Sequence, residues 1–188
     1  MIIDTDVLKT IPGESLPDAV HRAALYYISQ GIPVLPLEPG SKRLPEIGGI
    51  NYSSATTKAT TVDRWFGIDG KYRGFNLGMG CGAGKVMALD IDAKPIKGTT
   101  GIKELKKILD KEGPMPDGPV QLTPSGGFHH IFLWQENAAS SSSKVANGID
   151  TRGGVVDRCT GHIVVFPSIV DGKRYEWAQG GEIPPMPE

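Results

Sequence analysis

The stretch Val86-Met-Ala-Leu-Asp-Ile-Asp92 decides the predicted fold. It is an apolar run of strand length that ends in two acidic residues. Apolar residues at helical spacing follow at about 100–111, and Gly113 and Pro114 stop that helix. A buried strand, an amphipathic helix and several further short strands together predict an α/β (α+β) protein with a mixed sheet.

The same patterns, followed outward from this stretch, predict the remaining elements. Further helices are expected at 18–30 and 61–66. Further strands are expected at 32–37, 120–123, 130–134, 145–150, 162–166 and 174–177. Loops are expected at the glycine run 78–84 and at the serine-rich stretch 137–144, the latter flexible and exposed. We therefore expect a flexible arm at 1–17, one compact domain at 18–180, and a proline-rich tail or linker at 181–188.

Composition excludes several classes of protein. The 188 residues include 25 glycines and 15 prolines, which excludes an all-helical bundle. A net charge of −1 argues against a protein that coats nucleic acid through a broad basic face. The two cysteines, Cys81 and Cys159, are too few for a four-cysteine zinc site and predict a reducing cytoplasm. We expect no membrane segment, because no apolar run is long enough to span a bilayer.

Asp90 and Asp92 are the first candidate site. Side chains at i and i+2 of a strand point to the same face, so the two carboxylates can converge. Carboxylate pairs of this kind bind hard divalent cations such as Mg²⁺ and Mn²⁺. The alternative is a strand end with two solvated acids.

Ser125-Gly-Gly-Phe-His129 is the second candidate site, in the turn between two strands. Adjacent glycines let backbone N–H groups face an anion, and Ser125 and His129 can add side-chain donors for a triphosphate. His130 alternates to the opposite face, so His129 is the preferred histidine. The alternative is a tight hairpin with an incidental histidine.

Asp150 is the third candidate site, within Gly148-Ile-Asp-Thr-Arg-Gly-Gly154. A third acid on a neighbouring strand would complete a carboxylate cluster for two metal ions that serve a phosphoryl displacement. The alternative is a loop acid that is paired with Arg152.

The order of these three pieces resembles the prim-pol domain of the archaeo-eukaryotic primase superfamily, found in replication proteins of plasmids, phages and integrated elements. The resemblance extends from about residue 19 to residue 177. Flanking matches are Lys42 with Pro45, Trp65, Asn76-Leu-Gly78, Arg152-Gly153, Pro167-Ser168, Gly172, Tyr175 and Trp177. It implies an N-terminal αβ module and an RRM-like sheet, with the active site in the cleft between them.

The resemblance also implies roles for individual residues. Asp90, Asp92 and Asp150 would bind two Mg²⁺ or Mn²⁺ ions and form the catalytic centre. The nucleotide triphosphate would be held by Ser125, Gly126, Gly127 and His129, with Lys42 and Arg152 as further candidates for phosphate or template contact. The primer 3′-hydroxyl would then attack the α-phosphorus, and pyrophosphate would leave.

The resemblance implies DNA template and primer, a dNTP or NTP, and a helicase on the same or a separate polypeptide as partners, in the cytoplasm of a bacterial or archaeal host. No structural zinc is expected, because two distant cysteines cannot build the zinc-binding stem that some relatives carry. We expect the chain to extend primers but not to start them. The alternatives are a metal-dependent nuclease or phosphohydrolase, and a non-catalytic nucleic-acid-binding module on the same fold.

Overall fold

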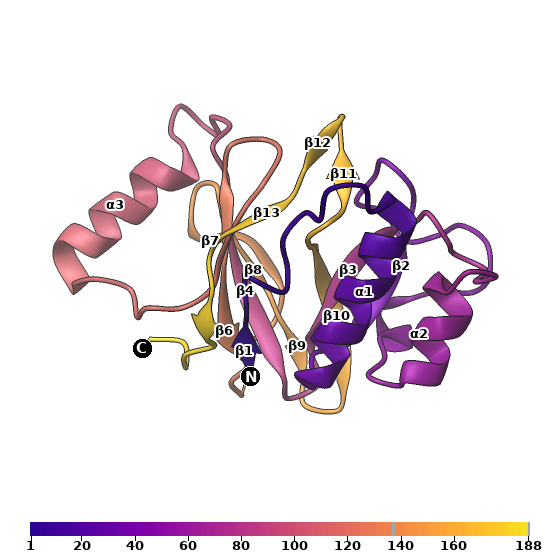
Figure 1. The fold of residues 1–188 in the computed structure, drawn as a ribbon. Coiled ribbons are helices and arrows are strands. Elements are labelled where there is room, and N and C mark those ends of the chain that lie inside the picture. The colour runs from indigo at the N-terminus through magenta and orange to yellow at the C-terminus, as the bar shows by residue number, and fades with distance from the viewer. Residues whose placement is uncertain (137, 188) are drawn as a thin grey trace.

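A computed structural model describes residues 1–136 and 138–187 (Figure 1). The described helices are α1 (Leu16–Ser29), α2 (Ala59–Phe66), α3 (Gly101–Glu112) and a 3₁₀ turn at Tyr52–Ser54. The described strands are β1 (Ile2–Ile3), β2 (Val34–Leu37), β3 (Asn76–Gly82), β4 (Val86–Ile91), β5 (Val120–Leu122), β6 (Phe128–Leu133), β7 (Ser141–Ala146), β8 (Ile149–Arg152), β9 (Gly154–Val155), β10 (Arg158–Val164), β11 (Ile169–Val170), β12 (Lys173–Arg174), β13 (Glu176–Gln179) and β14 (Gly181–Glu182). The α+β class is confirmed.

The main sheet branches at β4. β3 and β4 form a hairpin, but they pair only at Gly82 and Val86. From Ala88 onward β8 lies beside β4, with β6 on the other side. The sheet therefore divides into an acid wing (β13, β5, β6, β4, β8 and β7) and an opposite wing (β2, β3, β10 and β9). Every described strand pair of the sheet is antiparallel, which corrects the expected mixed sheet. Short turns join β5 to β6 and β7 to β8, and the longer connection through α2 returns the chain from β2 to β3 in the opposite direction.

Helices cover the two wings separately (Figure 1). α1 begins at Ser15, whose hydroxyl accepts the Asp18 N–H at 3.3 Å, and it packs with α2 over the opposite wing. The fully buried Tyr27 and Phe66 belong to that core. α3 begins at Thr100, whose hydroxyl caps Lys103, and places Leu105 in a second core under β4 and β8. The core under α1 and α2 extends to β4 and β6, whereas α3 covers a separate core. The described helices are too short or too polar to cross a membrane.

The two ends of the chain differ from expectation. β1 pairs with β14, and Ile3 and Leu8 are 1% and 2% exposed, so residues 1–17 are not a loose arm. Ile183 is 5% exposed, so the tail also contributes to the core. The polar and proline-rich composition of the two ends did not indicate this packing, because a few apolar side chains are enough to attach a short segment to an existing core. Residue 188, the last of the expected tail, lies outside the described residues.

Two expected loops are strands. The glycine run forms most of β3, where a Cβ at Gly80 would lie 2.7 Å from that of Ala55 and 2.9 Å from the Cys159 sulfur. Glycine is therefore used there for close packing within a strand. The serine-rich stretch contributes β7, which pairs with β8, and residue 137 of that expected loop lies outside the described residues. The single strand expected at 145–150 is instead the end of β7, a two-residue turn at 147–148 and the start of β8, and Gly148 in that turn has φ +76°.

Candidate active site

Strand register brings four polar residues into one line. Asp90 on β4 lies opposite His129 on β6 and, on its other side, opposite Asp150 on β8. His129 in turn lies opposite Gln121 on β5. Directly opposite residues of antiparallel strands project to the same face. Gln121, His129, Asp90 and Asp150 therefore form a continuous row, called the polar row below, although they come from four separate strands.

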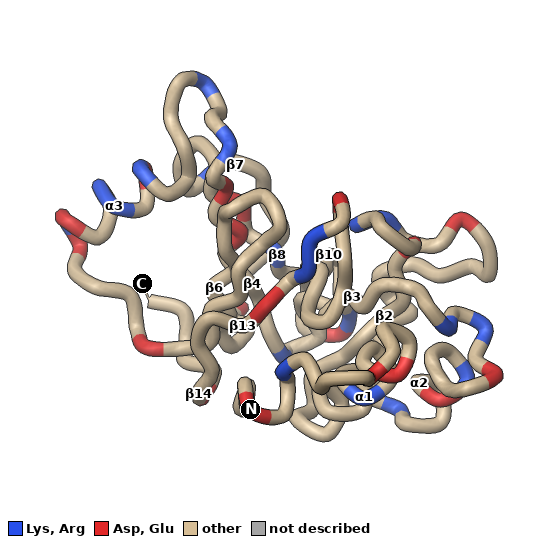
Figure 2. Tube along the Cα trace, turned by 45° about the horizontal axis from the view of Figure 1, so that its top comes forward, with Lys and Arg blue, Asp and Glu red and all other residues tan. Residues whose placement is uncertain are grey.

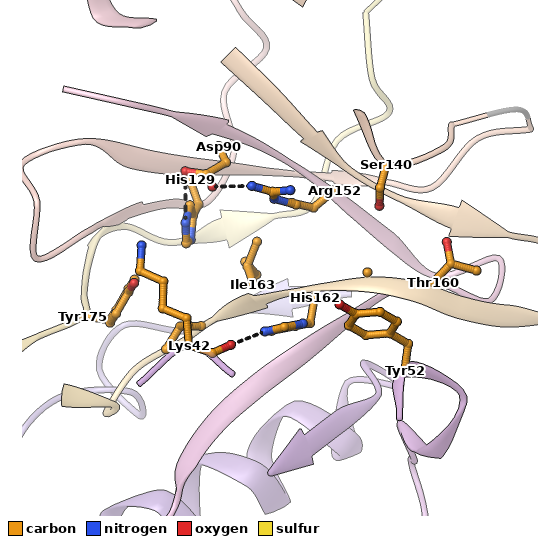
Figure 3. Close-up of a pocket in the computed structure, with 12 residues that line it drawn as sticks. Lys42, Tyr52, Asp90, His129, Ser140, Arg152, Thr160, His162, Ile163 and Tyr175 are labelled. Carbon is orange, nitrogen blue, oxygen red and sulfur yellow. Dashed lines mark hydrogen bonds and ion pairs between the residues drawn. The ribbon is translucent and has the colours of Figure 1, made fainter. Parts of the chain in front are cut away.

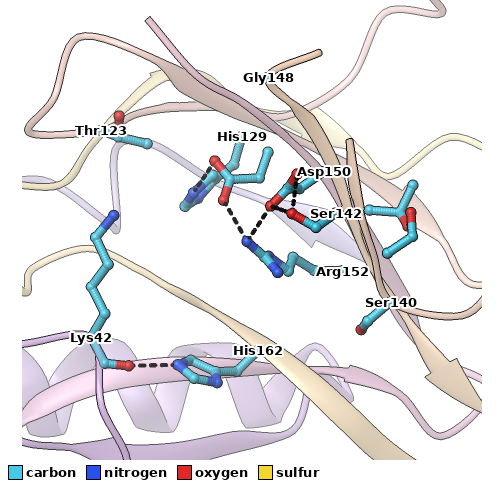
Figure 4. Close-up of polar contacts among 12 residues, drawn as sticks. Lys42, Thr123, His129, Ser140, Ser142, Gly148, Asp150, Arg152 and His162 are labelled. Carbon is cyan, nitrogen blue, oxygen red and sulfur yellow. Dashed lines mark hydrogen bonds and ion pairs between the residues drawn. The ribbon is translucent and has the colours of Figure 1, made fainter. Parts of the chain in front are cut away.

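Asp150 is the most enclosed acid of the polar row. Its carboxylate accepts the Ser142 hydroxyl at 3.1 Å and the Ser143 backbone N–H at 2.8 Å, and its side chain is 11% exposed (Figure 4). Both donors come from β7, the stretch expected to be a flexible loop. These bonds satisfy a carboxylate that burial would otherwise destabilise.

Arg152 lies between two acids of the row. Its Nη2 is 2.8 Å from Asp150 Oδ2 (Figure 4) and 3.4 Å from Asp90 Oδ2 (Figure 3). The alternative weighed for Asp150, an ion pair with Arg152, therefore exists in the structure. It also offsets the repulsion between two carboxylates on adjacent strands.

The acids differ in how readily they ionise. Burial of Asp90 is the largest influence and raises its pKa, but the hydrogen bond from His129 and the positive charges of Arg152 and Lys42 outweigh it and bring the pKa to about 2. Burial raises the pKa of Asp92, and the negative charges of Asp90 and Asp150 raise it further. Asp90 is therefore charged at neutral pH, and Asp92 experiences an excess of negative charge that a cation would relieve.

The three carboxylates are brought to one end of the acid wing but not to one point. Among the described residues, no group of three His, Cys, Asp or Glu side chains is already arranged to hold a metal ion. The donor set itself suits a hard divalent cation, since it consists of carboxylate oxygens. The raised pKa of Asp92, caused in part by the other two acids, indicates that positive charge is favoured there.

A cavity of about 230 Å³ separates the polar row from the opposite wing (Figure 3). Asp90, His129 and Arg152 line one side, and Lys42, Tyr52 and His162 line the other. The Lys42 carbonyl and His162 Nε2 are 2.9 Å apart, which fixes the Lys42 backbone against β10. The site is therefore a cleft whose two sides come from different wings of the sheet.

A second cavity of about 550 Å³ adjoins the first at Lys42. Its lining combines Asp92 and Ser125 with two basic side chains that the motifs do not include, Lys94 and Lys173. The expected nucleotide ligands are thus distributed over two cavities that share Lys42: Ser125 lines the second and His129 the first. Three lysines and two acids, Asp92 and Asp171, surround this space, so its lining has a net positive charge that suits an anionic ligand.

The glycines of the second candidate site shape the turn. The Gly126 N–H donates to the Thr123 carbonyl at 3.0 Å, and Gly126 has φ +87°. A Cβ at Gly127 would lie 2.2 Å from the Ile91 carbonyl oxygen. The expectation that the Gly126 N–H faces an anion is therefore corrected, because it closes the hairpin turn.

Sequence patterns missed several residues of the cleft. Lys94 follows Asp92 at strand spacing and was detectable in principle. Gln121, Tyr52 and His162 carry no local signal, since they reach the cleft only through strand pairing and loop packing. Tyr175 is only a flanking match in the sequence, and the structure stacks its ring on His129 with centroids 5.9 Å apart.

Fold and site together define a class: an α+β protein whose branched antiparallel sheet holds acids, a histidine and lysines around a cleft. A family model described as "Bifunctional DNA primase/polymerase, N-terminal" matches residues 24–188. The chain belongs to this Prim-Pol family. Membership implies a nucleotidyltransferase-type enzyme whose substrates are DNA and nucleotides, in a family that is generally metal-dependent. No curated protein matches the chain.

Proposed function

We propose that this chain is the catalytic domain of a metal-dependent, template-directed nucleotidyltransferase that adds nucleotides to a primer 3′-hydroxyl. The observation that carries the proposal is the polar row, in which Asp150, Asp90 and His129 lie side by side and Asp90 and His129 face a cleft lined by Lys42. Phosphoryl transfer depends chiefly on positioning and charge neutralisation, which this arrangement supplies without a protein nucleophile.

Asp90, Asp92 and Asp150 would hold Mg²⁺ or Mn²⁺. Such ions supply charge neutralisation and activation of the attacking hydroxyl. The support is the carboxylate chemistry of the three residues and the mutual repulsion seen in the raised pKa of Asp92. Arg152 neutralises part of this charge in the absence of a cation.

Residues of the two cavities that share Lys42 would bind the nucleotide. Ser125 and His129 would donate hydrogen bonds to phosphate oxygens, and Lys42, Lys94 and Lys173 would neutralise the triphosphate. Arg152 is a further candidate because its guanidinium already lies at the cleft. Gly126 and Gly127 would serve by shaping the turn that carries Ser125.

The wider setting that we propose is replication of a phage, plasmid or integrated element in the cytoplasm of a bacterial or archaeal host. DNA template and primer and a dNTP or NTP would be the substrates, and a helicase would act on the same polypeptide or as a separate protein. Figure 2 shows acidic and basic positions interspersed along the whole chain. This agrees with the net charge of −1 and supports moderate DNA affinity.

Primer extension tests the proposal. The protein is incubated with primed template, dNTPs and Mn²⁺ beside an Asp90→Ala/Asp92→Ala variant and a matched Asp110→Ala/Glu112→Ala control on the exposed face of α3. We expect nucleotide addition by the wild type and the control, and none by the site variant. Strand shortening would support the nuclease alternative instead. Retained DNA binding without any addition would support the non-catalytic module, and unchanged extension by the site variant would contradict the metal assignment.

Priming needs a separate assay. We expect residues 1–188 to extend a primer but to form no dinucleotide from template and free nucleotides. Dinucleotide synthesis by this chain alone would contradict that expectation while leaving the proposed polymerase activity intact.

A further inference from the structure

Gln121 is the member of the polar row that no proposed step uses. Its side chain is fully buried, on the short strand β5 beside His129. Its carbonyl oxygen Oε1 accepts the Phe166 backbone N–H at 2.9 Å. Its nitrogen Nε2 is 2.9 Å from the Val164 carbonyl oxygen and 3.1 Å from His129 Nδ1. Every polar group of this amide therefore has a partner.

The two backbone partners fix which way the amide points. A backbone N–H can only donate, and a backbone carbonyl can only accept. Rotating the amide by 180° would place two donors against each other at Phe166 and two acceptors against each other at Val164. The amide nitrogen of Gln121 must therefore face His129.

The orientation of Gln121 determines which nitrogen of His129 carries the ring proton. An amide nitrogen has two hydrogens and accepts none, so one hydrogen goes to Val164 and the other to His129 Nδ1. Nδ1 must then accept, and in the neutral ring the proton lies on Nε2. This Nε2 is 3.4 Å from Asp90 Oδ1, at the side of the ring that meets the cleft.

The ring is also held in place. The side chain of His129 is 4% exposed, and the Tyr175 ring stacks against it at an interplanar angle of 28°. A ring flip would exchange Nδ1 for a carbon in front of Gln121 and leave a buried donor without an acceptor. Stacking and hydrogen bonding thus favour the same orientation.

We propose that Gln121 is a positioning residue that keeps His129 Nδ1 free of a proton and the ring proton on Nε2, so that the histidine presents an N–H donor to the cleft. Phosphate oxygens at neutral pH chiefly accept hydrogen bonds, so this tautomer is the one that recognises the triphosphate of an incoming nucleotide. That consequence rests on the proposed function, whereas the tautomer itself does not.

Nitrogen NMR of the histidines tests the tautomer directly. The protein is labelled with ¹⁵N-histidine and studied at about pH 8, above the ordinary histidine pKa of about 6.5. The His129 signals are assigned by their loss in a His129→Gln variant. We expect a protonated Nε2 and an unprotonated Nδ1. A proton on Nδ1, or on both nitrogens, overturns the proposal.

Two substitutions separate positioning from structural support. Gln121→Met keeps the volume but removes the donor, and we expect His129 to become a mixture of tautomers. Gln121→Glu replaces the donor by an acceptor, and we expect the proton to move to Nδ1. Gln179→Met, on the adjacent strand β13, is the matched control and should leave the His129 signals unchanged. An unchanged tautomer in a folded Gln121→Met protein overturns the proposal; if that variant does not fold, the wild-type spectrum decides.

Primer extension then measures the consequence. For Gln121→Met we expect the nucleotide KM to rise by about tenfold, as when partners that orient other site histidines are removed. An unchanged KM alongside a changed tautomer contradicts the role in nucleotide recognition. If the wild type adds no nucleotides, the proposed function fails while the NMR result still decides the tautomer.

Discussion

The two sides of the cleft are built in different ways. On the acid wing, each member of the polar row lies directly opposite its neighbour, and backbone ladders fix the spacing. On the other side, Lys42 and Tyr52 come from loops and a 3₁₀ turn, and His162 comes from β10. Backbone pairing therefore holds the charges of the polar row in place, and we call this the fixed side of the cleft. The long side chain of Lys42 extends from a loop and can change its position, so we call that side the adjustable side. Metal ligands need side chains that are held in place, whereas phosphate contacts tolerate side chains that can move.

The largest expected effect is on the fixed side. Asp150→Asn keeps the shape of the side chain and removes its charge, so we expect nucleotide addition to fall by about 10²–10³-fold, the range for loss of one pre-organised charged or polar group. Initial rates of primer extension at saturating nucleotide measure it. Asp157→Asn, in the turn before β10, is the control. A fall below about fivefold would mean that Asp150 acts mainly through its pairing with Arg152.

Lys42 tests the adjustable side. Lys42→Ala removes a charge that lines both cavities, and we expect the nucleotide KM to rise by about tenfold with little change in kcat, as for one charge-assisted contact of about 1.5 kcal/mol. The exposed Lys106 on α3 gives the matched control, Lys106→Ala. A loss in kcat that equals the loss in kcat/KM would show that Lys42 acts in the transition state and that the two sides do not differ in this way.

Arg152 lies on the same side of the cleft as the acids, because it belongs to β8 and pairs with Asp90 and Asp150. It competes with a cation for Asp90 and Asp150, so Arg152→Ala should bind Mn²⁺ more tightly in the absence of nucleotide, by about fivefold for a partly exposed pair. Calorimetric titration with Mn²⁺ measures the change. Weaker Mn²⁺ binding would indicate that Arg152 holds the acids in their binding arrangement.

The last prediction concerns stability and not activity: it compares two glycines in the turn between β5 and β6 by the free energy of unfolding in urea. Gly127→Ala forces a Cβ to within 2.2 Å of the Ile91 carbonyl oxygen and should cost about 3 kcal/mol. Gly126→Ala meets only the Ala93 Cβ, at 3.7 Å, and should cost about 1–2 kcal/mol for its positive φ. A larger loss of stability for Gly126→Ala than for Gly127→Ala would show that the backbone conformation matters more at this turn than the room for a Cβ.

Much of the fixed side was predictable. Asp90 and Asp92 are two residues apart at the end of an apolar strand, and Ser125 and His129 flank a glycine pair between strands. Such signals are short-range, because strand alternation and turn chemistry act over a few residues. The extended β3 was missed for the opposite reason: its glycines are explained by Ala55 and Cys159, which approach it from distant segments.

The sequence by itself determined the α+β class, the order of the three acid and histidine segments, and the side of the strand on which Asp90 and His129 lie. The tertiary structure alone decided that Asp150 lies beside Asp90, that Ser142 and Ser143 support it, and that Gln121 faces His129. The physical reason is range. Local propensities act between neighbours in the chain, whereas strand register and the packing of one wing against the other depend on contacts between residues far apart in sequence.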